Sequence, residues 1–407
     1  MSSPTGIDRV TEAYGRWLLS RPDVRLIPVC TIAGVASPMS LSRFRRILEH
    51  ERPAREDADI QWRRLGEALS AAPGEAATLR AVPGRSLQAR APVRYGLFGA
   101  KALASLRAAR PGTAALYLNV SHFGLEQPRV LERLAVRGAR MAAMIHDLIP
   151  IVHPEYCSAP AAGWHVRRVE SLLRHDSVII ANSRSTAQEL RAFAKARDLP
   201  EPRVFVAPLG LEPVFTAGLE APSTARPYFV CVGTIEPRKN VAFLLTLWRN
   251  LAERMGEKTP WLVLAGRRGW ENEAIIDHLE RSPPIRRFVH EVNDLTDSQL
   301  ASLIKGAHAL LAPSFAEGFN LPVAEAAALG TPVIASDIAV HRELALHARL
   351  LDPTDGPAWL TAIQAAAQSR VRGRISTPFS WDEHFAIAGQ ALGLAHAGGA
   401  RALRSTS

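Results

Sequence analysis

The sequence predicts an α/β protein built from two doubly wound domains. In both halves of the chain, short runs of valine, isoleucine and leucine alternate with amphipathic stretches, a pattern typical of parallel sheets covered by helices. The 407 residues suffice for two or three domains of about 150 residues each. Hydrophobic residues make up 47% and charged residues 22%, which excludes a disordered or collagen-like chain.

The second half shows the alternation most clearly. Its expected strands are 228–232, 261–265, 288–290, 309–312 and 333–335. The helices expected between them are 240–254, 271–281, 296–306 and 322–330. Thr296 and Gln299 form a capping box, while Pro322 and Gly330 mark the first turn and the end of another helix. This order of elements is that of a complete doubly wound unit.

The first half is less regular. Its expected strands are 24–30, 114–120, 141–146, 178–182 and 204–206. Between the first two lies 41–110, which is rich in alanine, arginine and proline and is expected to be either a helical insertion or a partly mobile lid. The proline-containing stretch 213–227 is the expected linker. The expected domains are therefore 1–212 and 228–378.

The net charge is +10, and residues 41–110 hold 14 Lys/Arg against 7 Asp/Glu. Such an excess suits an anionic partner, namely a lipid surface, a nucleic acid or a phosphorylated substrate. A solvated arginine-rich surface is the alternative. No zinc-finger or RNP pattern supports nucleic acid, so no nucleic-acid partner is expected. No apolar run reaches the ~18 residues of a membrane span, and no signal peptide is visible, which predicts a cytoplasmic location.

The segment 316–334 is the first candidate site. An expected strand ends at Ala312, and a loop with Glu317 and Gly318 leads into the helix that carries Glu325. Backbone N–H groups at a helix N-terminus suit a phosphate. These donors are expected from Phe319, Asn320 and Leu321. Both glutamates are expected at one cleft, to bind sugar and ribose hydroxyls; two solvent-facing glutamates beside a glycine turn are the alternative.

The segment 233–240 is the second candidate site and follows the first strand of the same unit. It begins with Gly233 and Thr234 and contains Arg238 and Lys239. Arginine offers a planar fork to a diphosphate and lysine a point charge. A basic helix start is the alternative. Because both segments follow strands of one sheet, they are expected at one crevice.

These motifs resemble the family 4 retaining glycosyltransferases, the group 1 type with a GT-B fold. Glu317 and Glu325 match the E-x7-E motif of that family, and the Gly233–Thr234 and Arg238–Asn240 segments match its diphosphate loop. The resemblance covers residues 114–392 and includes 182–186, 208–210 and 379–381. It implies two Rossmann-like domains facing across a cleft, with residues 379–395 forming a helix that crosses back to the N-terminal domain.

The resemblance also implies roles for the candidate residues. Glu325 would hold the ribose, Glu317 the donor sugar, and Arg238 with Lys239 the leaving diphosphate. Gly266, Val292 and Asn293 lie where the family recognises the nucleobase. No cofactor or metal is expected, because the cationic side chains replace one. Segment 232–240 looks like that of mannosyltransferases for bacterial surface polysaccharide, which makes GDP-mannose the expected donor.

Three further residues of the first half are candidates. His146, at the end of an expected strand, matches the family's histidine on the sugar side and is an expected catalytic residue. His122 also follows a strand and is expected either to face substrate or to be structural. Gly6 lies in a segment that looks like the family's glycine loop. The family places a strand before this loop, so either a start site further upstream or a truncated chain is expected.

The expected function is transfer of a hexose, with retention, from a nucleotide sugar to a glycan or lipid-linked acceptor in polysaccharide biosynthesis. A non-catalytic nucleotide-sugar-binding or partner subunit, with a degenerate N-terminal domain, is the alternative. Peripheral contact with an anionic membrane, on the inner face of the cell membrane, stays open because of the basic stretch 41–110.

Overall fold

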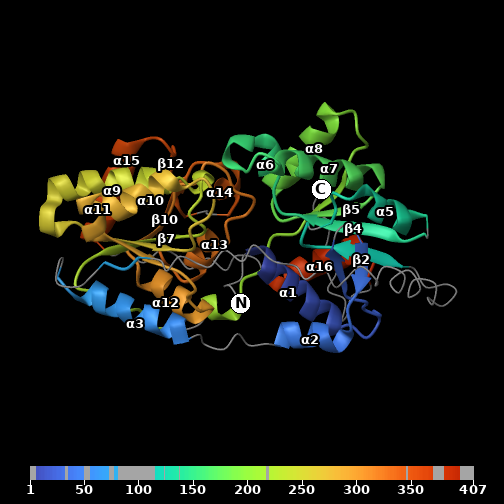
Figure 1. Ribbon diagram of the computed structural model, residues 1–407, viewed down its shortest axis with the longest axis horizontal. Coiled ribbons are helices and arrows are strands. Elements are labelled where there is room, and N and C mark those ends of the chain that lie inside the picture. Colours follow the sequence, from blue (N-terminus) through green and yellow to red (C-terminus); the bar gives the residue numbers. More distant parts are fainter. Residues whose placement is uncertain are drawn as a thin grey trace.

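The computed structural model describes residues 6–32, 35–49, 56–72, 78–80, 115–122, 124–136, 138–216, 220–344, 347–369 and 380–394. The chain forms two parallel sheets that lie in separate units of the molecule (Figure 1). Much of segment 41–110, Phe379 and the tail after 394 lie outside the described residues.

The C-terminal unit is a six-stranded parallel sheet in the order β12-β11-β10-β7-β8-β9. Its strands are β7 (Tyr228–Val232), β8 (Trp261–Ala265), β9 (Val289–Val292), β10 (Ala309–Ala312), β11 (Val333–Ser336) and β12 (Arg349–Leu351). The five expected strands are confirmed, and β12 is an additional edge strand that was not predicted from the sequence. After β7 the chain adds β8 and β9 on one side of that strand, and it then adds β10, β11 and β12 on the opposite side of β7. The topological switch point therefore lies between β7 and β10.

Seven α-helices of the described chain lie between these strands or follow the last of them. They are α9 (Val241–Met255), α10 (Glu273–Arg281), α11 (Pro283–Phe288), α12 (Asp297–Gly306), α13 (Leu321–Ala328), α14 (Ala339–Leu344) and α15 (Gly356–Gln368). The predicted capping box is confirmed, because Thr296 caps α12 together with Gln299. Trp248 and Trp359 are fully buried, and each indole N–H donates to a backbone carbonyl, which satisfies the one polar group that each brings into the core.

The N-terminal unit is a four-stranded parallel sheet in the order β3-β4-β5-β6. Its strands are β3 (Leu116–Asn119), β4 (Arg140–Ile145), β5 (Val178–Ala181) and β6 (Arg203–Val206), which confirms four of the five expected strands. The helices that follow them are α5 (Pro128–Ala135), α6 (Ile149–Val152), α7 (Ala161–Arg174) and α8 (Arg184–Ala196), with the short 3-10 helix η1 (Pro154–Tyr156).

The strand expected over 24–30 is wrong. The chain instead forms β1 (Val29–Ile32), which pairs antiparallel with β2 (Val35–Pro38) in a separate two-stranded sheet. Pro28 explains the difference: it has no N–H for a sheet ladder, so a strand cannot continue through it inside a parallel sheet.

The first and last helices lie together on the N-terminal unit. Helix α1 (Gly6–Leu19) and α16 (Trp381–Leu392) are joined by a hydrogen bond between the Tyr14 hydroxyl and His384 Nε2 at 2.9 Å. Trp17 and Phe385 stack with ring centroids 4.6 Å apart. The β-carbon position of Gly210 is 2.3 Å from the Trp381 nitrogen, so the segment after β6 touches the start of α16.

The described parts of 41–110 divide between the two units. Helix α2 (Leu41–Glu49) packs against α1, whereas α3 (Glu56–Ser70) lies along the C-terminal unit (Figure 1). Leu65 and Leu69 are fully buried in the core of that unit. The backbone of Leu79 accepts a hydrogen bond from Glu291 N at 3.0 Å, beside the edge strand β9. Of the two expectations, these parts form a helical insertion.

In the described part of the chain, no helix combines the length and the apolar character that crossing a bilayer requires.

Candidate functional site

The candidate site lies at the carboxyl ends of β7 and β10, where the topological switch point opens a crevice in a doubly wound sheet. Two loops meet there, 233–240 after β7 and 313–320 after β10. They are tied together by a hydrogen bond from Phe315 N to the carbonyl oxygen of Arg238 at 2.9 Å. The structure thus brings together the two segments that the sequence singled out.

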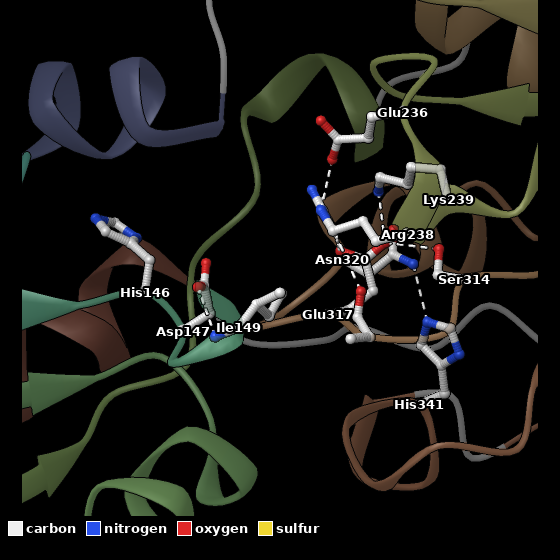
Figure 2. Close-up of polar contacts among 12 residues, drawn as sticks. His146, Asp147, Ile149, Glu236, Arg238, Lys239, Ser314, Glu317, Asn320 and His341 are labelled. Atoms are coloured by element: carbon white, nitrogen blue, oxygen red, sulfur yellow. Dashed lines mark hydrogen bonds and ion pairs between the residues drawn. The ribbon is translucent and has the colours of Figure 1, made fainter. Parts of the chain in front are cut away.

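A cluster of charged groups lies between these loops (Figure 2). Glu317 accepts from Arg238 Nη1 at 2.6 Å and from Lys239 Nζ at 2.5 Å. The Ser314 hydroxyl donates to the same carboxylate at 2.7 Å. Arg238 also forms an ion pair with Glu236, between Nε and Oε1 at 2.5 Å. The two cations are therefore fixed in place and balanced by two carboxylates.

Glu317 is ionised in this cluster. Its burial opposes ionisation, but Arg238 and Lys239 together with hydrogen bonds from Lys239 and Ser314 outweigh it and hold the pKa of Glu317 well below its ordinary value. Burial raises the pKa of Glu236, against the lowering effect of Arg238 and Lys239. A carboxylate held this firmly in its charged form accepts hydrogen bonds and is unsuited to proton transfer near neutral pH.

The glycines of the first loop allow close packing at the strand ends. A β-carbon on Gly266 would lie 1.9 Å from the Gly233 carbonyl oxygen, so the loops after β7 and β8 touch. Gly233 has φ +138°, and the Lys239 side chain passes 3.1 Å from its β-carbon position. Thr234 is partly buried, and its methyl group lies 2.6 Å from the β-carbon position of Gly269.

Helix α13 begins in a strained turn that a buried histidine holds. Asn320 has φ +69° and precedes Leu321, the first helical residue. Its side-chain amide donates to His341 Nε2 at 2.8 Å, and His341 Nδ1 donates to the Ser336 carbonyl oxygen at 2.8 Å (Figure 2). Burial lowers the pKa of His341, which fits this neutral tautomer. The side chain of Phe319 is buried in the core, which leaves its backbone at the helix start.

His146 contacts the site through its backbone. A β-carbon on Gly318 would lie 2.0 Å from the His146 carbonyl oxygen. The imidazole points away from Glu317 (Figure 2) and its Nε2 donates to the Val120 carbonyl oxygen at 2.8 Å. Burial lowers the pKa of His146. The structure therefore brings the backbone of His146, and not its imidazole, to the Glu317 cluster.

His122 has a structural position. It is buried with φ +66°, and its Nε2 accepts from the His146 backbone N–H at 3.1 Å. Burial, together with the nearby His146 and His165, holds the pKa of His122 well below its ordinary value. Its ring therefore fixes the end of β4 as a neutral group.

Glu325 belongs to a second charged cluster. It is 2% exposed and accepts from Arg9 Nη1 at 2.6 Å, while Arg9 Nη2 reaches Asp297 Oδ1 at 2.6 Å. Gly6, the first residue of α1, has its β-carbon position 3.5 Å from Leu321 Cδ1. The N-termini of α1 and α13 therefore meet, and two helix starts with their N–H groups lie close to the crevice.

The expected nucleobase loops also meet. Gly266 N donates to the Val292 carbonyl oxygen at 2.8 Å, whereas the side chain of Val292 is in the core. Asn293 N donates to the side chain of Gln61 at 3.0 Å, and Gln61 belongs to α3. Arg267 forms an ion pair with Asp294 beside them.

Five site residues were not predicted from the sequence: Arg9, Gln61, Glu236, Ser314 and His341. Two of them had a sequence signal: Arg9 lies one turn after the glycine that opens an amphipathic helix, and Glu236 lies within the candidate segment 233–240. Gln61, Ser314 and His341 contact the site from positions whose local pattern is ordinary.

Comparison with known proteins gives a consistent picture. The family described as "Glycosyl transferases group 1" matches residues 226–369. Serotype-specific mannosyltransferase WbdA of Escherichia coli is 29% identical over 245 residues, which cover 55% of this chain and 29% of that protein. O-antigen chain mannosyltransferase B of Escherichia coli is 27% identical over 267 residues, covering 60% of this chain and 68% of that protein. The chain thus spans less than a third of the length of WbdA.

Two solved structures show the fold. Sucrose-phosphate synthase from Thermosynechococcus elongatus has a TM-score of 0.52 and 19% identity, covering 72% of this chain and 73% of that chain. HepE of Anabaena, solved in complex with UDP-glucose, has a TM-score of 0.51 and 16% identity, covering 68% and 74%. At these identities the likeness concerns the fold alone, and the fold is GT-B.

Proposed function

We propose that this chain, whose residues 226–369 form a glycosyltransferase group 1 domain, transfers a hexose from a nucleoside-diphosphate sugar to a glycan or lipid-linked acceptor in polysaccharide biosynthesis. The observation that carries the proposal is the Glu317 cluster, in which Arg238 and Lys239 are fixed at the switch point of the sheet. The likeness to mannosyltransferases of Escherichia coli supports mannose as the sugar and GDP-mannose as the donor.

The cluster has the chemistry that departure of a diphosphate requires. As the bond to the sugar breaks, negative charge develops on the diphosphate, and preorganised cations at that place stabilise it. Arg238 and Lys239 are held by carboxylates in the structure, so they need no reorganisation to meet that charge. We propose that the two cations replace a metal ion and that the enzyme needs no cofactor.

Glu317 fits the role of a hydroxyl acceptor for the donor sugar. Its pKa is held low by Arg238 and Lys239, so it stays a carboxylate during the reaction. In the retaining mechanism proposed here, the leaving diphosphate oxygen takes the acceptor's proton on the same face of the sugar. The acceptor oxygen then bonds to the anomeric carbon as the bond to the diphosphate breaks, and no nucleophile of the protein is required.

The remaining parts of the donor have proposed places in the same crevice. Glu325 would accept hydrogen bonds from the ribose, and the loops at Gly266 and at 292–294 would hold the base. The backbone of His146 and the start of α1 at Gly6 line the side from which the acceptor and donor phosphates would approach. We propose that His146 positions the transferring sugar through this strand end.

Helix α2 supports contact with an anionic membrane on the cytoplasmic side. Leu41 is 38% exposed and Ile47 is 49% exposed, beside the exposed Arg43, Arg45 and Arg46. Apolar and basic side chains together on one exposed helix suit a surface of anionic lipid. Co-sedimentation with vesicles containing phosphatidylglycerol, and its loss in an Arg43→Glu, Arg46→Glu variant, would support this contact. Equal binding to neutral phosphatidylcholine vesicles would contradict it.

A thermal-shift series followed by a transfer assay tests the function. GDP, GDP-mannose, UDP and UDP-glucose are added separately without metal, and a ligand at 100 times its Kd stabilises the folded chain by about 2.7 kcal/mol. We expect the guanine ligands to raise Tm and GDP-mannose to be consumed when acceptor is present, with the anomeric configuration of the product read by NMR. Donor binding without turnover would support the non-catalytic alternative, and no shift with any nucleotide would contradict both.

A further inference from the structure

Arg9 joins the two units of the molecule at one buried carboxylate. It belongs to α1, which packs on the N-terminal unit, whereas its guanidinium lies 2.6 Å from Glu325 on α13 and 2.6 Å from Asp297 at the start of α12. The guanidinium carbon lies 5.5 Å from the centroid of the Phe215 ring, and the side chain is 14% exposed. The side chain of Arg9 is therefore buried in the C-terminal unit, although its helix α1 packs on the N-terminal unit.

The surroundings of Glu325 make the ionisation of its carboxyl group depend on Arg9. Burial raises the pKa of Glu325, and the carboxylates of Asp297 and Glu212 raise it further. Arg9 acts in the opposite direction, through its charge and through its hydrogen bond. Among the described residues it is the cation paired with Glu325. Removing it leaves a buried carboxyl group that faces two like charges.

The geometry leaves one oxygen of Glu325 for a ligand. Arg9 bonds Oε1, and within the described chain no hydrogen bond to Oε2 is formed. A ribose carries two neighbouring hydroxyl groups that donate to a carboxylate oxygen, and hydrogen bonds to a charged acceptor are the strong ones. A carboxyl group that has taken up a proton would offer a weaker acceptor.

We propose that Arg9 is a positioning residue of the donor site, which holds the Glu325 carboxylate from the opposite unit so that its second oxygen accepts a ribose hydroxyl. This inference rests on the proposed function, since it assumes a nucleotide in the crevice. It adds a consequence: the nucleotide is bound fully only while α1 is seated on the C-terminal unit, so donor binding and the contact between the units support each other.

The test compares Arg9→Met and Arg9→Lys with the wild-type chain by calorimetric titration of GDP and of 2′-deoxy-GDP between pH 5.5 and 8.5. Arg9→Met should weaken GDP binding about 10- to 100-fold at neutral pH, because the ribose hydroxyl loses its charge-assisted hydrogen bond to the Glu325 carboxylate. Its GDP affinity should rise with pH more steeply than that of the wild type, because burial and two like charges then act on Glu325 without the opposing cation. Both proteins are titrated in parallel, so that the ionisation of GDP itself cancels in the comparison. The preference of Arg9→Met for GDP over 2′-deoxy-GDP should shrink, and Arg9→Lys should restore part of both properties.

Arg16→Met is the matched control, since Arg16 lies on the same helix with its side chain 57% exposed. It should bind GDP as the wild type does. If Arg9→Met does not fold, Arg9→Lys and the 2′-deoxy-GDP comparison carry the test alone. GDP binding by Arg9→Met that is unchanged or tighter overturns the inference, as does an equal loss for both nucleotides at every pH, which would mean a merely structural role. A wild-type chain that binds no nucleotide overturns the proposed function and this inference with it.

Discussion

The β-carbon position of Gly318 lies 2.0 Å from the carbonyl oxygen of His146, so the loop after β10 and the end of β4 touch without room for any side chain. This contact joins the two units directly beside Glu317. His146 in turn is anchored, because its carbonyl oxygen accepts from the Asn182 side chain at 2.9 Å. A larger residue would therefore meet the carbonyl group of His146 and the Cβ of Asp147, which the fold holds in place.

We expect Gly318→Ala to separate this contact and to lower the transfer rate at least tenfold, because a methyl group would overlap fixed backbone. Overpacking of this kind costs about 1–3 kcal/mol. Initial rates and urea denaturation measure the two effects. The control is Gly163→Ala in α7, where the nearest atom is the end of Arg167 at 3.7 Å. Wild-type rates in Gly318→Ala would show that the two units need not touch during transfer.

Glu317→Gln should abolish most of the transfer while keeping nucleotide binding. The amide keeps the shape of the side chain but releases Arg238 and Lys239 from their shared anion, so GDP should bind as well as before or more tightly. The rate should fall about 10²- to 10³-fold, as for loss of one preorganised group. Rates and GDP titrations are compared with Glu253→Gln, whose carboxylate is exposed on α9. Full activity in Glu317→Gln would remove this carboxylate from the mechanism.

The stability of the wild type and that of Glu317→Gln should depend differently on pH. The folded-state pKa of Glu317 lies below its unfolded value, so its ionic contacts stabilise the fold fully above the unfolded carboxyl pKa of about 4.3. That stabilisation is lost as the pH falls from there toward the folded pKa. The free energy of unfolding of the wild type should therefore drop more steeply below about pH 4.5 than that of Glu317→Gln. Parallel urea curves from pH 7 to pH 3 would contradict this.

Asn320 should tolerate glycine better than alanine. Its φ of +69° costs any residue with a β-carbon, and its side chain offsets that cost by donating to His341. Asn320→Ala loses the hydrogen bond and keeps the strain, so a destabilisation of about 1–3 kcal/mol is expected. Asn320→Gly loses only the hydrogen bond. Equal Tm values for the two variants would show that the backbone angle costs nothing here.

Leu65→Ala should destabilise the C-terminal unit although it lies early in the chain. The side chain is fully buried in the core of that unit, and truncating such a leucine costs about 2–5 kcal/mol. Ile47→Ala on the neighbouring helix α2 is the control, because Ile47 is 49% exposed. Tryptophan fluorescence during urea denaturation reports the result. A difference between the two variants below about 0.5 kcal/mol, the size of an ordinary surface effect, would indicate that α3 is only loosely attached.

The sequence predicted best what depends on local pattern. The strands that flank the switch point and the capping box at Thr296 follow from hydrophobic runs and short-range polar spacing, and the loops that carry Glu317 and Lys239 follow from the strand order. The failure at 24–30 is also local, because Pro28 removes a ladder donor within an otherwise suitable run.

What the sequence did not predict depends on pairs far apart in the chain. Arg9 and Glu325 are 316 residues apart, and no periodicity connects them. Glu317 pairs with Arg238 and Lys239. Glu325 pairs with Arg9 from the other end of the chain, and the sequence predicted neither pairing. The direction of the His146 imidazole is set by the Val120 carbonyl, which depends on how two strands are packed and not on either segment alone.

Leu65 and Leu69 leave the ribosome long before the strands that they cover. The two leucines share one buried cluster with Tyr228 and Val289, and α3 packs against β9; these strands are made only after the whole N-terminal sheet. The apolar face of α3 is therefore exposed to solvent during synthesis until the C-terminal sheet has been made. During refolding, the contact between α3 and that sheet should form late, because the two segments are far apart in the sequence. A fragment consisting of residues 226–369 alone would lack α3 and the segment at Leu79, and would expose the surface that they bury. An independently stable C-terminal unit accordingly needs residues 56–80 supplied with it, either in the same polypeptide or as a separate peptide.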